Sequence, residues 1–130
     1  MYIRIKSIPY KEQRYPTCGD YWIDKNGVKQ FRVNDMGNED YHFLVSIHEQ
    51  IEEYLTQRRG LKESDIMAFD VMFEKEREEG KHAPDDEPGD DPSAPYHHEH
   101  VFAETIERLL AIQMDVNWAE YGKAVEKSCD

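Results

Sequence analysis

Two short segments of this chain each place a histidine four residues before a glutamate. The pairs are His48 with Glu52 and His100 with Glu104. Both segments carry apolar residues at helical spacing, and residues four apart in a helix lie on one face, close enough to share a ligand. Imidazole nitrogens and carboxylate oxygens bind zinc, iron and manganese. The spacing therefore predicts a divalent-metal site between helices, with zinc as the first choice and manganese, iron or magnesium as alternatives.

The first pair belongs to the motif His48-Glu49-x-x-Glu52. This motif resembles the His-Glu-x-x-His helix of zinc metallopeptidases, in which the outer positions bind zinc and the inner glutamate is the general base. The resemblance implies that His48 and Glu52 are ligands and Glu49 is the base. The chain departs from that family at Glu52, where the second histidine would stand. The competing interpretation is an ordinary helix with one histidine at the edge of the core and solvated glutamates.

A carboxylate on a later helix is a further candidate. Asp70 lies at the margin of the apolar face of its predicted helix, and a buried carboxylate without a partner costs several kcal/mol. We therefore expect Asp70 to be a fourth ligand or a hydrogen-bond partner of a ligand. Pairing with Arg58, Arg59 or Tyr96, or simple exposure, is the alternative.

The second pair follows the densest run of ligand-type residues in the chain, at 96–100. On a helical wheel, His100 and Glu104 fall about 120–160° from the apolar stripe, so they face the first helix only if this helix is buried on two sides. Glu99 or His97 could replace them as ligands. The stripe that we expect to point inward consists of Phe102, Ile106, Leu109 and Leu110.

An acidic segment separates the last two of the three long helical regions. Residues 80–95 contain several prolines and five acids, which are Asp85, Asp86, Glu87, Asp90 and Asp91. Their spacing differs from the twelve-residue calcium loop of an EF-hand, and prolines interrupt it. The composition favours a flexible acidic loop or lid.

The predicted elements define an α+β fold in a single domain, residues 1–130. Residues 1–36 are β-rich, and Asn26-Gly27 between two alternating segments predicts a hairpin. Residues 38–127 are helical, with segments at about 38–59, 63–79, 96–114 and 118–127. We therefore expect an N-terminal β-hairpin or small antiparallel sheet followed by a three- to four-helix bundle.

Composition limits the partners. The chain has 130 residues, with 28 acids, 16 bases and a formal charge of −12. This charge argues against direct binding to nucleic acids and favours cations or a basic protein. The isolated Cys18 and Cys129, with no apolar signal core at residues 1–6, indicate reduced thiols in the cytoplasm. No apolar run reaches the ~20 residues that span a bilayer.

The chain also resembles a family of small phage and bacterial proteins without an assigned activity. The resemblance covers about residues 42–121 and implies a phage-type context but no mechanism. It rests on His48-Glu49-x-x-Glu52, Arg59-Gly60-Leu61, Phe69-Asp70, Glu87-Pro88-Gly89-Asp90, Glu99-His100 with Ala103 and Glu107, and Trp118 with Tyr121.

These residues suggest metal-dependent hydrolysis of a small molecule or peptide, in which the metal acidifies water and Glu49 takes its proton. A variant is an all-α nucleotide pyrophosphohydrolase that binds magnesium; Glu49-x-x-Glu52 fits half of its motif, but the second acidic pair is missing. A structural metal without catalysis is a third possibility. The alternative from another class is an acidic interaction protein that mimics DNA or inhibits a basic host protein.

Overall fold

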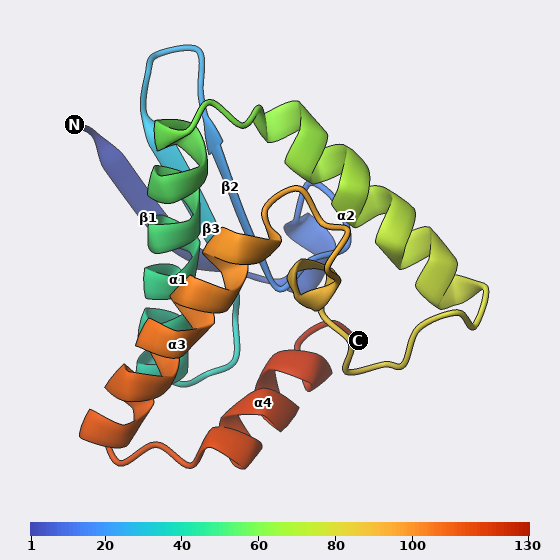
Figure 1. Cartoon of the computed structure of the whole chain (residues 1–130). Helices are drawn as coiled ribbons and strands as arrows, with labels where there is room; N and C mark the ends of the chain where they lie inside the picture. The colour runs from blue at the N-terminus through green and yellow to red at the C-terminus, as the bar shows by residue number, and fades with distance from the viewer.

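The computed structural model describes residues 1–130 and has the expected α+β fold, with a small sheet followed by four helices (Figure 1). Two short 3-10 turns lie at Tyr10–Glu12 and Pro88–Asp90. The strands are β1 (Ile3–Ile8), β2 (Gly19–Ile23) and β3 (Lys29–Asn34), and the helices are α1 (Glu39–Arg58), α2 (Glu63–Glu78), α3 (His97–Gln113) and α4 (Trp118–Lys127). None of the helices is both long and apolar enough to cross a membrane.

The sheet is mixed, with strand order β1-β3-β2. The predicted hairpin forms the antiparallel pair β2–β3. The sequence also predicted an antiparallel sheet, but β1 pairs with β3 in parallel. The connection between Ile8 and Gly19 leaves room for one strand between β1 and β2, and β3 later occupies that central place in the sheet. β1 is therefore an exposed edge strand.

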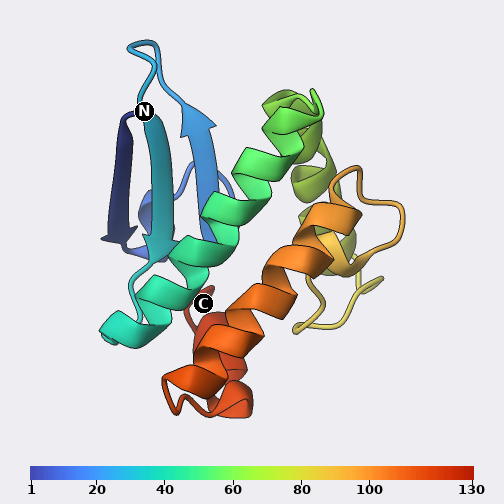
Figure 2. The same ribbon diagram turned by 60° about the vertical axis from the view of Figure 1, so that its left-hand side comes forward.

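Helix α1 lies between the sheet and α3. It crosses one face of β2 and β3, and α3 runs beside it in the opposite direction (Figure 2). The side chain of Asn38 caps α1 by accepting a hydrogen bond from the backbone N–H of Tyr41, as the residue type predicts. Asn117 caps α4 in the same way. This arrangement brings the two predicted histidine–glutamate pairs onto neighbouring helices.

Two small apolar clusters form the core. One contains Tyr21, Phe31, Ile66, Ala94 and Tyr96. The other contains Val33, Leu44, Val45, Ala111 and Tyr121. Both clusters use one face of the sheet. The first adds Ile66 of α2 and two residues that precede α3, and the second adds residues of α1, α3 and α4.

The inward face of α3 differs from the prediction. Of the predicted stripe, Phe102 and Leu109 are 50% and 58% exposed, whereas Ile106 and Leu110 are half-buried and Leu110 packs against the second apolar cluster. The buried residues of this helix are Glu99, His100, Ala103, Glu107 and Ala111. Alanines at two of these positions allow the backbone of α3 to approach α1 closely, and the buried polar side chains have partners inside the molecule. The polar face is therefore the packed one.

Candidate metal centre

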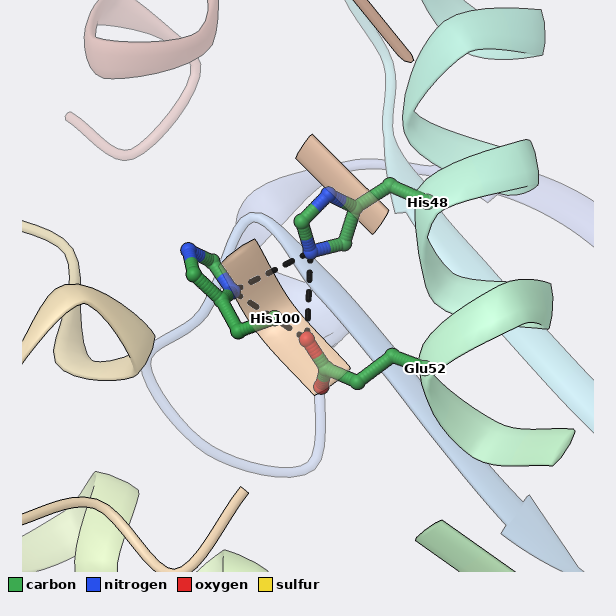
Figure 3. A group of neighbouring side chains, drawn as sticks. All are labelled: His48, Glu52 and His100. Carbon is green, nitrogen blue, oxygen red and sulfur yellow. Dashed lines mark hydrogen bonds and ion pairs between the residues drawn. The ribbon is translucent and has the colours of Figure 1, made fainter. Parts of the chain in front are cut away.

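The side chains of His48, Glu52 and His100 meet between α1 and α3 (Figure 3). His48 Nε2 lies 3.1 Å from Glu52 Oε2 and 3.2 Å from His100 Nδ1, and His100 Nδ1 lies 3.1 Å from the same glutamate oxygen. All three residues are at least nine-tenths buried. The three atoms thus form a nearly equilateral triangle of typical metal-ligand atoms.

The second ring nitrogen of His48 also has a carboxylate partner. His48 Nδ1 lies 2.8 Å from Glu107 Oε1, and the other oxygen of Glu107 accepts a hydrogen bond from the Tyr121 hydroxyl. A carboxylate on the far nitrogen of a histidine fixes its tautomer and orients the near nitrogen. Glu107 and Tyr121 therefore hold the Nε2 atom of His48 toward the triangle.

The far nitrogen of His100 faces the acidic loop. His100 Nε2 lies 3.0 Å from Glu87 Oε2 and 3.2 Å from Asp90 Oδ1. The nitrogen forms ion pairs with both carboxylates, although neither contact has the alignment of a hydrogen bond. The backbone of Gly89 packs against the ring so closely that a Cβ there would lie 2.2 Å from His100 Cγ. The middle of the predicted flexible loop is thus packed against the candidate centre.

The charges within the triangle depend on one another. Burial alone would lower the pKa of His48 and His100, but hydrogen bonds and charges from the surrounding carboxylates raise both pKa values well above the usual range. Burial opposes ionisation of Glu52, yet its bonds to His100 and His48 lower its pKa to about 2. Without a metal, protons on the imidazoles therefore balance the carboxylates.

The triangle forms part of the wall of a cavity of about 200 Å³. Glu49 lines the same cavity and packs on Gly19 of β2, where a Cβ would lie 2.6 Å from Glu49 Oε1. Burial, with the negative charge of Glu52, raises the pKa of Glu49 well above its ordinary value. Glu49 is therefore placed beside the candidate ligands, as the motif predicts, although no hydrogen bond joins it to them.

The buried acids of the molecule fall into two groups. Asp20, Glu53 and Glu99 pair with Arg14, Lys29 and Arg59 respectively. The other four line the cavity, as Asp20 also does, and have no arginine or lysine within ion-pair distance; they are Glu49, Glu52, Asp70 and Glu107. These four acidic groups therefore share the cavity with two histidines, and its one arginine, Arg14, is paired with Asp20.

The remaining predicted ligands lie outside the triangle. Asp70 accepts hydrogen bonds from the hydroxyls of Tyr15 and Tyr96. Burial raises the pKa of Asp70 to about 7. Glu104 lines the cavity without joining the trio, and burial raises its pKa. Of the alternative ligands, Glu99 pairs with Arg59, and His97 Nδ1 bonds to the carbonyl of Gly89 at 2.8 Å.

The sequence interpretation did not identify the residues that contact the far side of each ring. Glu107 stands seven residues after His100, which is two helical turns, so its position on the same face was available from the sequence. Glu87 and Asp90 were visible only as members of an acidic run, because their contact with His100 depends on how the loop folds back.

Comparison of the chain with models of known families, curated proteins and solved structures finds no match.

Proposed function

We propose that this protein binds a divalent transition-metal ion through His48 Nε2, Glu52 and His100 Nδ1. The carrying observation is the triangle of these atoms, with sides of 3.1–3.2 Å. In a tetrahedral zinc site with ligands about 2.0–2.1 Å from the ion, neighbouring ligand atoms lie about 3.3 Å apart. An ion just off the plane of the triangle would therefore need only a small adjustment of the side chains.

The ligand types favour zinc, with manganese or iron as alternatives. Two imidazoles and one carboxylate are typical of these ions, whereas magnesium prefers oxygen ligands and retains its water. The bond from His48 to Glu107 supplies the supporting carboxylate that zinc-bound histidines commonly have. These preferences weaken the magnesium-dependent pyrophosphohydrolase alternative.

We propose hydrolysis as the reaction. Three protein ligands leave a fourth position for water, whose pKa zinc lowers to about 7. Glu49 lines the same cavity and would accept the proton of that water. The cavity acids repel phosphates, and its one arginine, Arg14, is already paired with Asp20. A neutral or cationic ester, amide or peptide therefore fits better than a nucleotide.

The burial of acids argues against a DNA mimic, which needs its acids on a contiguous surface. Seven of the 28 acids are buried, and five of these line the cavity. The net charge of −12 therefore overstates the charge available to a partner surface.

Elemental analysis of tag-free protein tests the metal site. We expect about one tightly bound equivalent of zinc, manganese or iron, which His48→Ala and Glu52→Gln lose. His98→Ala is the matched control, because His98 is exposed on the same helix as His100. Protein that cannot be loaded with metal, or equal metal loss in the control, would overturn the proposal.

The hydrolytic step has a separate test. Glu49→Gln should keep the metal but lower the rate of hydrolysis of p-nitrophenyl acetate or of a peptide substrate by about 10²–10⁴-fold. A variant that keeps both metal and full rate would remove Glu49 from the reaction. Metal without hydrolysis of any ester, amide or peptide would leave a structural metal site.

A further inference from the structure

The buried Nε2 atom of His100 points out of the proposed centre, toward a second group of ligand-type atoms. His100 Nε2, Glu87 Oε2 and Asp90 Oδ1 lie within 4.8 Å of one another. The two carboxylate side chains are about half exposed, at 44% and 51%, whereas His100 is 6% exposed. One imidazole and two carboxylates suit zinc, manganese or iron.

The decisive feature is the state of that nitrogen. It is buried and forms ion pairs with two carboxylate oxygens at 3.0 and 3.2 Å, but neither contact has the alignment of a hydrogen bond. An ion held between the three groups would replace these poorly aligned ion pairs with direct bonds to one nitrogen and two carboxylate oxygens.

The loop is built to hold these groups in place. Gly89, between the two acids, packs directly on the His100 ring, and its carbonyl binds His97 Nδ1 at 2.8 Å. Arg77 of α2 donates hydrogen bonds to the carbonyls of Ala83 and Asp86. The acids are therefore not a free acidic run, because contacts to two helices anchor the turn that carries them.

We propose that His100, Glu87 and Asp90 form a second divalent-metal site, bridged to the first through the two nitrogens of the His100 ring. This proposal rests on the proposed function in sharing His100. Binding at both nitrogens requires the ring to be an imidazolate, so the Nε2 proton passes to solvent when the second ion binds. Its exposed carboxylates make the second site the weaker one, filled only when metal is added.

The second ion has a structural role. With Zn–N bonds of about 2.0 Å on both sides of one ring, the two ions lie about 6 Å apart. Two-metal hydrolases hold their ions about 3.5–4 Å apart so that both contact the reacting oxygens. The second ion is therefore too distant to share the water of the first, and it fixes the 80–95 loop and the His100 ring instead.

Calorimetric titration of the metal-free full chain with Zn²⁺ alone tests this site. We expect two equivalents in the wild type and one in the double variant Glu87→Gln/Asp90→Asn. The matched control, Glu78→Gln/Asp85→Asn, removes the same two charges from exposed side chains and should keep two. Circular dichroism verifies that all variants are folded.

The same variants separate this proposal from the first. One equivalent in the wild type that His48→Ala abolishes and Glu87→Gln/Asp90→Asn leaves unchanged would overturn the second site and keep the first. One equivalent that survives His48→Ala but is lost in the loop variant would keep a site at Glu87, Asp90 and His100 and would overturn both the first site and the bridge. Absence of zinc binding in the wild type would overturn both.

Discussion

His48 and His100 use their two ring nitrogens for different contacts. Each ring directs one nitrogen to Glu52 and the other to a carboxylate outside the triangle. For His48 the outer contact joins Nδ1 to Glu107; when the ring is neutral, the proton on Nδ1 is donated to that carboxylate and the Nε2 lone pair is left for a metal. The buried carboxylate of Glu107 thus orients His48 but does not belong to the triangle of candidate ligand atoms.

Removal of the Glu107 charge should weaken metal binding without removing a ligand. We expect Glu107→Gln to lower zinc affinity by about 10–100-fold, because His48 loses its charged partner. Competition with a chromogenic zinc chelator measures the effect. Glu104→Gln on the same helix is the control, and an equal loss in that variant would assign the effect to general charge around the cavity.

Asp70 should affect stability through pH. Burial raises its pKa to about 7 in the folded protein, against 3.8 as the ordinary value, so the folded state holds the proton more tightly than the unfolded chain. Stability from this residue is therefore complete below about pH 4 and is lost as the pH rises toward 7.

Asp70→Asn mimics the protonated carboxyl and should remove this dependence. In metal-free protein, we expect the variant to gain a few kcal/mol relative to the wild type between about pH 4 and pH 8. Urea denaturation at pH 4, 6 and 8 measures the difference. Parallel stability curves for the two proteins would show that Asp70 ionises in the fold as freely as in the unfolded chain.

For the helices, the sequence predicted where each one begins and ends better than which face it buries. Helix α1 ends within a residue of its predicted boundary, because Asn38 caps its start and the chain turns at Gly60. The predicted inward face of α3 was wrong at Phe102 and Leu109, because apolar periodicity assumes that the apolar stripe is the buried one; Leu110 does pack against the core. Here Ala103 and Ala111 allow close packing, and charged residues with partners occupy the interior.

Two substitutions on α3 distinguish these orientations. Leu109→Ala should change the free energy of unfolding by no more than about 0.5 kcal/mol, because Leu109 is largely exposed. Ala103→Leu should cost about 1–3 kcal/mol, because Ala103 is fully buried and has no room for a larger side chain. Chemical denaturation measures both free energies of unfolding. A loss of about 2–5 kcal/mol in Leu109→Ala would show that the apolar stripe is buried after all.

For the whole molecule, the α+β class and the three residues of the triangle were predictable from local patterns. His48 and Glu52 follow from helical spacing, and His100 from its position in a similar step. The partners of the rings were less accessible, because Glu87 and Asp90 reach His100 through the path of a loop that no periodicity describes. The parallel pairing of β1 likewise depends on a crossing that the strand patterns do not encode.

Metal binding should stabilise the entire fold. An ion that binds only the folded state contributes about 2.7 kcal/mol when its free concentration is 100 times the Kd. We therefore expect zinc to raise the Tm by several °C and EDTA to reverse the change. Thermal unfolding of the wild type beside His48→Ala provides the test; equal shifts in both proteins would indicate binding elsewhere.

The chain distance between Glu52 and His100 has a practical consequence. These residues are 48 positions apart, and the exposed Asp85 lies between them in the loop. A chain cut at that point would give one piece with the sheet and two ligands and another with α3, α4 and the third ligand. Because the pieces share one coordination site, zinc would act as a removable clasp, and the cut protein could serve as a metal-controlled split reporter.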